Sequence, residues 1–140
     1  MEYPLLFSHL LLYNSGEPGI TVPVFLRLGE TSLRVETKLD TGATYCIFQR
    51  IYGKDLGINI ESGAPKRFGT ATGSFLTYGH WITLSVHDFD FDVMVYFAVN
   101  DDFKRDVLGR HGFLDRMLIG LDDYAGKLYL RHNDDNFEIE

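Results

Sequence analysis

Asp40, Thr41 and Gly42 are the residues whose types and order are best suited to chemistry. They follow the segment Ser32–Leu39, in which apolar and polar residues alternate as in a half-buried strand. A carboxylate at the end of such a strand is partly desolvated and can still be reached by a ligand. Thr41 can hydrogen-bond the loop, and Gly42 lets the backbone approach closely. The same three residues also form ordinary turns, so the tripeptide alone is a weak signal.

Other reactive residue types lie in weaker patterns. Cys46 lies in an apolar run with no histidine close in sequence, which favours a buried structural thiol over a nucleophile. Asp88–Asp92 resembles the start of a calcium loop, but Val93 and Val99 replace its glycine and glutamate. The histidines are not spaced as zinc ligands, so we expect no metal site and no cofactor. They are His9, His80, His87, His111 and His132.

The composition restricts the classes of function. The chain has 140 residues, 13 Lys and Arg against 20 Asp and Glu, a formal charge of −7, and 45% hydrophobic residues. This length and hydrophobic content suit one domain with its own core. The acidic balance disfavours binding to nucleic acid or to an anionic membrane, because both need a basic face. A single cysteine rules out an internal disulfide and fits a reducing compartment.

The N-terminal segment Pro4–Tyr13 is apolar but has only about half the length that crosses a bilayer. The chain begins Met1-Glu2-Tyr3, without the positive charge that starts a secretory signal. We interpret the segment as a strand, a short signal sequence being the less favoured alternative. The expected location is therefore cytoplasmic.

The remaining elements are predicted to be mostly β-strands with one or two short helices. Closely spaced strands and turns favour a compact barrel or sandwich over a βαβ fold. Helices are expected at Gln49–Leu56 and Arg110–Met117. The expected strands are Val22–Leu28, Ser32–Leu39, Tyr45–Phe48, two within 67–86, one at 89–99, and a hairpin of 118–121 with 127–131.

Two motifs together resemble the retropepsin-like aspartic proteases, the single-domain relatives of pepsin. The first is Leu39-Asp40-Thr41-Gly42-Ala43, and the second, about 65 residues later, is Val107-Leu108-Gly109 before the predicted helix. The segment 114–130 is similar to the closing helix and hairpin of a pepsin-type lobe. The resemblance covers about residues 21–131 and implies a closed acid-protease barrel that forms a two-fold homodimer.

The resemblance also implies a role for each residue of the first motif. Asp40 would be catalytic, as one of two aspartates that share a proton. Because this chain holds only one Asp-Thr/Ser-Gly motif, the second aspartate would come from a symmetry-related subunit. Thr41 would brace the two active-site loops and Gly42 would contact the substrate backbone.

Further residues would complete the site. Ala43 and Thr44 would line the first substrate pockets, and a flap would close over the cleft. The flap would consist of Thr70, Ala71, Thr72, Gly73, Ser74 and Phe75. Structural support beneath the catalytic loop would come from Val107, Leu108, Gly109 and Arg110.

The sequence departs from the family in two places. Retroviral members have an acidic residue where this chain has Thr44, so Arg110 lacks the partner that the family provides. In addition, residues 1–20 and 132–140 have no counterpart outside the domain at 21–131. We interpret 132–140 as a tail and 1–20 as an extension that could supply a dimer-interface strand through Leu5, Phe7, Leu10 and Leu12.

The sequence therefore predicts an aspartic endopeptidase that acts on peptide or protein substrates as a homodimer. The intact motif at Asp40 favours an enzyme, because a binding module has no need of that carboxylate. The alternative is a non-catalytic dimerisation or peptide-binding module of the same fold, which the substitution at Thr44 leaves open.

Overall fold

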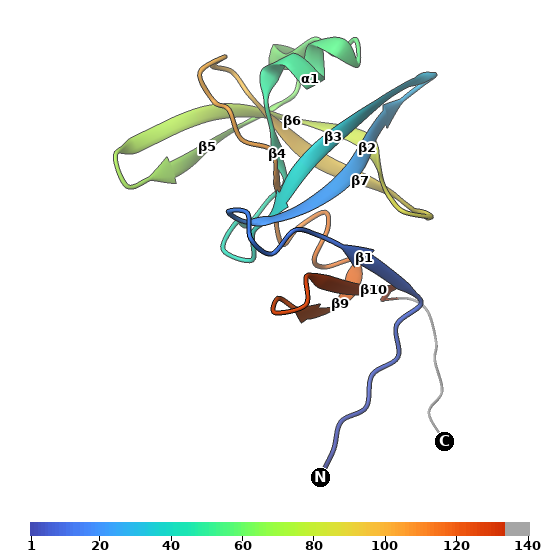
Figure 1. Cartoon of the computed structure of the whole chain (residues 1–140). Helices are drawn as coiled ribbons and strands as arrows, with labels where there is room; N and C mark the ends of the chain where they lie inside the picture. Colours follow the sequence, from blue (N-terminus) through green and yellow to red (C-terminus); the bar gives the residue numbers. More distant parts are fainter. Residues whose placement is uncertain (134–140) are drawn as a thin grey trace.

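A computed structural model describes residues 1–133 and arranges the chain as two β-sheets (Figure 1). A seven-stranded sheet holds most of the core, and a three-stranded sheet is formed by segments from both ends of the chain. Within the described residues there is one α-helix, α1 (Arg50–Asp55), and one 3-10 turn, η1 (Ile60–Ser62). The prediction of a mostly β chain is confirmed, as is the helix expected at Gln49–Leu56.

The larger sheet has the strand order β2-β3-β8-β4-β7-β6-β5, with a further pairing between β2 and β6. Most neighbours are antiparallel, but β8 runs parallel to β3, and β4 runs parallel to β7. Its strands are β2 (Ile20–Leu28), β3 (Thr31–Leu39), β4 (Ile47–Phe48), β5 (Ala64–Thr70), β6 (Gly73–Val86), β7 (Phe89–Ala98) and β8 (Val107–Leu108).

The hairpin of β2 and β3 shows how the sequence pattern builds this sheet. Val22, Val24 and Leu26 alternate along β2 and are fully buried, so one face of the strand enters the core. Gly29 has a φ of +59°, which suits the tight turn between the strands. The predicted hairpin is confirmed, and β3 ends at Leu39, directly before Asp40.

The smaller sheet joins the two ends of the chain in the order β1-β10-β9 and lies near both termini in Figure 1. Its strands are β1 (His9–Leu12), β9 (Met117–Asp122) and β10 (Lys127–His132), all antiparallel. The predicted C-terminal hairpin is confirmed. Phe7 packs against Tyr129 and over Gly120, whereas Leu10 and Leu12 are exposed.

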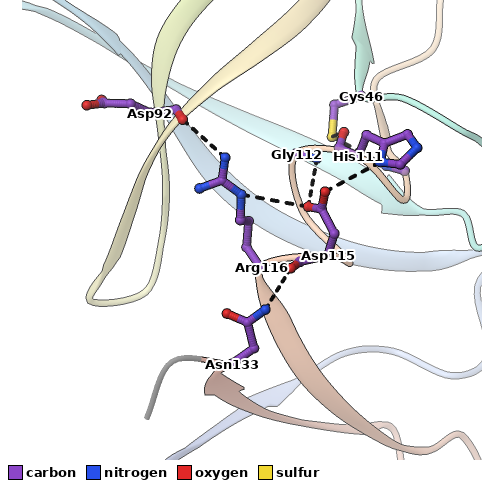
Figure 2. A network of polar contacts seen from close by, with 8 residues as sticks. Cys46, Asp92, His111, Gly112, Asp115, Arg116 and Asn133 are labelled. Atoms are coloured by element: carbon purple, nitrogen blue, oxygen red, sulfur yellow. Dashed lines mark hydrogen bonds and ion pairs between the residues drawn. The ribbon is translucent and has the colours of Figure 1, made fainter.

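The helix expected at Arg110–Met117 is wrong, and so is the closing helix expected from Leu114: this segment is a series of turns before β9. Figure 2 shows the contacts that hold it. Gly112 has a φ of +106°, which an α-helix does not allow, and its N–H donates to the Asp115 carboxylate at 3.0 Å. The His111 N–H donates to the Thr44 carbonyl at 2.8 Å. Pairing with the Asp40 loop thus takes the place of helical hydrogen bonds.

Two predictions concern membrane crossing and the C-terminal tail, 132–140. Among residues 1–133, no helix is both long and apolar enough to cross a membrane. Of the predicted tail, His132 ends β10, and residues 134–140 lie outside the described part of the chain.

Candidate active site

Asp40 begins the loop that leaves β3, and the backbone around it is held by short hydrogen bonds. Its N–H donates to the Leu108 carbonyl at 2.9 Å, and its own carbonyl accepts the Ala43 N–H at 3.2 Å. Its Oδ1 accepts the Gly42 N–H at 2.9 Å. The side chain is 38% exposed. The loop therefore holds a carboxylate in a defined place and leaves it open to a ligand.

Gly109 lies directly beneath this loop. A Cβ atom there would lie 2.3 Å from the Tyr45 carbonyl oxygen and 2.7 Å from that of Ala43, distances that only glycine avoids. The next residue, Arg110, donates its N–H to the Ala43 carbonyl at 2.9 Å while its side chain is exposed. Glycine after β8 is thus required by the close approach of two backbone segments.

A cavity of about 550 Å³ lies between the Asp40 loop and the hairpin of β5 and β6. Seven of the residues expected in the site line it: Asp40, Gly42, Ala43, Thr44, Thr70, Phe75 and Val107. Eight do not, namely Thr41, Ala71, Thr72, Gly73, Ser74, Leu108, Gly109 and Arg110. Among the described residues, Asp40 is the only carboxylate in the lining.

Sequence reasoning found Phe75 but missed the other two aromatic residues of the cavity wall, Phe68 and Phe103. Phe75 stacks on Phe68 at a centroid distance of 5.7 Å and on Phe103 at 4.9 Å. Phe68 and Phe75 are directly opposed across the hairpin, so a hairpin register centred on residues 71 and 72 would have paired them. Phe103, Arg105 and Ile47 also line the cavity, and Phe103 and Arg105 lie in an irregular segment whose sequence carries no such signal.

Arg105 adds a positive charge beside Asp40. One of its guanidinium nitrogens lies 3.8 Å from Asp40 Oδ2, and its side chain is 69% exposed. An ion pair this exposed contributes at most about 1 kcal/mol to stability. Its position matters more than its strength, because it is the one cationic residue among the described residues that line a mainly apolar cavity.

Asp106 is the neighbouring carboxylate and has a different role. Asp106 is buried and does not line the cavity. Gln49 donates its backbone N–H and its side-chain amide to the two Asp106 carboxylate oxygens, at 3.0 and 2.8 Å. Burial raises its pKa, and the bonds from Gln49 oppose the rise. Its carbonyl accepts the Lys38 N–H at 2.9 Å. Asp106, which directly precedes β8, is therefore hydrogen-bonded both to β3 through Lys38 and to the residue before α1, Gln49.

Cys46 is a structural thiol, as the apolar run around it predicts. The residue is fully buried, and burial raises its pKa to about 12. Its Sγ accepts the Gly109 N–H at 3.4 Å and lies 3.6 Å from the His111 carbonyl, to which it donates. A thiol held in this way is protonated and inert at neutral pH.

The hairpin of β5 and β6 forms the opposite wall, and its tip is exposed throughout residues 69–74. The tip is held by local contacts: Thr70 Oγ1 donates to the Gly73 carbonyl at 3.1 Å and accepts the Thr72 N–H at 3.4 Å. Within residues 1–133, no hydrogen bond joins Ala71 or Ser74 to the Asp40 loop. The tip is therefore positioned by the hairpin itself.

Comparison with solved structures identifies the fold. A retropepsin-like aspartic protease from Rickettsia conorii matches over 86% of this chain and 96% of its own, with a TM-score of 0.66 and 15% identity. EIAV protease, solved with the inhibitor HBY-793, matches over 71% of this chain and 88% of its own, with a TM-score of 0.53 and 22% identity. No sequence-family model and no curated protein sequence matches. The chain therefore has a retropepsin-like fold.

Proposed function

We propose that this protein is an aspartic endopeptidase whose active site is completed by a second copy of the chain. The observation that carries the proposal is the position of Asp40: it is held by the backbone of the loop, open to solvent, and the only carboxylate among the described residues that lines the cavity. Two solved neighbours of this fold are themselves proteases, which supports the same class of reaction here.

The chemistry that we propose needs two carboxylates a few ångströms apart. Such a pair cannot ionise fully, so it shares one proton. The ionised member takes a proton from a bound water, and the protonated member donates a hydrogen bond to the peptide carbonyl. The water adds to the carbonyl carbon as one carboxylate takes its proton. In the second step a protonated carboxyl of the pair gives a proton to the nitrogen, and the C–N bond breaks to release an amine and a carboxylic acid.

A two-fold homodimer supplies the pair most simply, with one Asp40 from each chain. A two-fold axis that passes beside Asp40 would bring the same residue of the partner opposite it. In this arrangement Thr41, which is exposed and lies outside the cavity, is available to brace the two loops. The exposed Leu10 and Leu12 of β1 are candidates for a shared apolar contact.

The remaining walls suit an extended peptide. Gly42, Ala43 and Thr44 line one side of the cavity with small side chains, and Phe68, Phe75 and Phe103 offer apolar surface on the other. We propose that the hairpin tip, residues 70–75, acts as the flap that covers the peptide and excludes water from the reacting atoms.

The first test is proteolysis of an unfolded protein substrate from about pH 4 to 7, with the Asp40→Asn variant beside the wild type. Loss of the one carboxylate that each chain contributes to the reacting atoms should lower kcat/KM by at least about a thousandfold. The Asp40→Asn variant keeps an oxygen for the Gly42 N–H and loses only an exposed ion pair with Arg105, so the free energy of unfolding should change by at most about 1 kcal/mol. Equal cleavage by the two proteins, or cleavage by neither, would leave the binding-module alternative.

A second test separates a shared site from a single-chain site. If each dimer needs two Asp40 side chains, an excess of the Asp40→Asn chain should inhibit the wild type by forming mixed dimers. Sedimentation of the same mixtures confirms that dimers are present. Wild-type activity that is unaffected by excess variant, in a sample that exchanges subunits, would contradict the paired-aspartate mechanism.

A further inference from the structure

A cluster of two histidines and one aspartate lies where the two sheets meet, away from the Asp40 cavity. His9 is the first residue of β1, and His87 and Asp88 form the turn between β6 and β7. The nearest ligand atoms of the three side chains all lie within 4.8 Å of one another. The three residues bring together two imidazole nitrogens and a carboxylate oxygen, the donor types that zinc prefers.

The His9 ring is oriented by its neighbours. It packs edge-on against Phe89 at a centroid distance of 4.5 Å, and Ser8 Oγ lies 2.8 Å from its Nδ1. Ser8 Oγ also lies 3.4 Å from the Leu130 carbonyl oxygen, so the Ser8 hydroxyl has an acceptor for its proton other than the imidazole ring. When Nδ1 carries the ring hydrogen and donates it to Ser8, Nε2 keeps the lone pair that a metal ion needs.

His9 Nε2 lies 3.2 Å from Asp88 Oδ2, a distance that a hydrogen on Nε2 bridges when no metal is bound. A metal ion can take the place of that hydrogen and bind both atoms. A metal ion also accounts for His87, whose ring lies edge-on to His9 at 5.2 Å and adds a second nitrogen that a bridging proton would not need.

His87 lies in the turn between β6 and β7 with a left-handed backbone. Its φ is +56°, a value that glycine adopts most easily and that asparagine, aspartate and histidine adopt more often than other residues do. A histidine there holds its imidazole on the side of the turn that faces His9. Ligand atoms around one tetrahedral zinc lie about 3.3 Å apart, given bonds of about 2.0 Å. The exposed His87 and Asp88 side chains can close the remaining gap by rotation about their own bonds.

We propose that His9, His87 and Asp88 form a zinc site that ties β1 to the turn between β6 and β7. The fourth position of a tetrahedral ion is left to water. Because β1 belongs to the smaller sheet and β6 and β7 belong to the larger one, a bound ion would hold the two sheets together. The site is independent of Asp40 and of any peptidase activity.

The test is a titration of the untagged full chain with zinc chloride, followed by calorimetry and by thermal unfolding. The wild type should bind one zinc ion per chain, and binding should raise its Tm by several degrees because the ion binds only the folded state. His87→Gly removes the imidazole and suits the positive φ, so the chain should fold normally while zinc affinity falls at least tenfold. Asp88→Asn should also weaken binding at least tenfold.

A matched control is available in His111→Asn. His111 also lies beside an aspartate, with Nδ1 3.4 Å from Asp115 Oδ2, but belongs to no three-residue cluster among the described residues. This variant should bind zinc as the wild type does. Equal affinity in the wild type and His87→Gly would overturn the proposal, and so would an unchanged wild-type Tm at a tenfold excess of zinc. An equal response to magnesium chloride would also overturn it, because magnesium prefers oxygen ligands.

Discussion

The two walls of the cavity are built in opposite ways. The wall that carries Asp40 is locked by backbone contacts: the Asp40 N–H bonds to Leu108, and Gly109 lies too close to two carbonyl oxygens to accept any side chain. The opposite wall, the tip of the β5–β6 hairpin, is exposed, and a Cβ added at Gly69 would meet nothing within 4 Å.

The difference would allow one small domain to combine positioning with access. The proposed reaction needs the carboxylate in a fixed place, because a shift of about 1 Å can cost a hundredfold in rate. A wall that is to admit a peptide, as proposed, needs freedom to move, and such motion is characteristic of exposed hairpins with few tertiary contacts. The comparison predicts that equal changes in the two walls have unequal effects.

The largest difference in stability should appear when a methyl group is added to the Asp40 wall and, as a control, to the hairpin wall. Gly109→Ala would put its Cβ against the carbonyl oxygens of Tyr45 and Ala43, and the backbone must move to relieve the clash. We expect the free energy of unfolding to fall by about 3 kcal/mol or more. Gly69→Ala is the matched control and should change it by less than about 0.5 kcal/mol. Urea unfolding measures both, and similar values would remove the distinction between the walls.

The next effect concerns the support behind the locked wall. Asp106→Ala removes the carboxylate that accepts two hydrogen bonds from Gln49. The backbone N–H of Gln49 then loses its carboxylate acceptor. Unfolding should become easier by about 1–2 kcal/mol. Asp106→Asn retains one acceptor oxygen and should lose less. If the two variants prove equally stable in urea, the hydrogen bonds to Gln49 do not support this wall.

A change in the open wall should be felt locally. Phe75→Ala removes the ring that stacks on Phe68 and Phe103, at a cost of about 1 kcal/mol. Amide hydrogen exchange should then become faster across the hairpin, residues 64–79, and stay unchanged at Asp40 and Arg110. Equal acceleration on both sides of the cavity would mean that the walls are coupled.

The smallest effect is a pH dependence from Asp106. Burial raises its pKa above the unfolded value of 3.8, so between the two values the folded state binds more protons than the unfolded state. Stability conferred by protonated Asp106 is therefore lost as the pH rises through this window. The difference in unfolding free energy between Asp106→Asn and the wild type should increase in favour of the variant as the pH rises above about 4. A difference that does not vary with pH would show that burial does not shift this carboxyl group.

Much of the fold was predictable because its signals are local. The period of two in Ser32–Leu39 and the turn at Gly29 specify a hairpin whatever else the chain does. The helix predicted at Arg110–Met117 failed because the competing interaction is distant in sequence. The backbone of Arg110 and His111 bonds to Ala43 and Thr44, and no property of the local segment reveals those partners.

The residues of the candidate site also differ in whether local sequence could predict them. Asp40, Gly42 and Thr44 were predictable because a strand, a carboxylate and a glycine occur in one short run. Arg105 and Phe103 were not, because they reach the cavity from an irregular segment that only the packing of β8 brings beside Asp40. The structure places these residues, while the roles proposed for Asp40, Thr41, the tip residues and the rest of the site remain predictions.

The strand pattern and the single Asp-Thr-Gly can be read from the sequence, because each depends on residue type and short spacing. The mechanism proposed from that motif then requires a second carboxylate from another chain. The surroundings of the motif depend on the tertiary structure. It placed Arg105 against Asp40, and it brought His9 to His87 and Asp88 across most of the chain length. Contacts of that kind arise from the pairing of strands distant in sequence, and they leave no periodic signal along the chain.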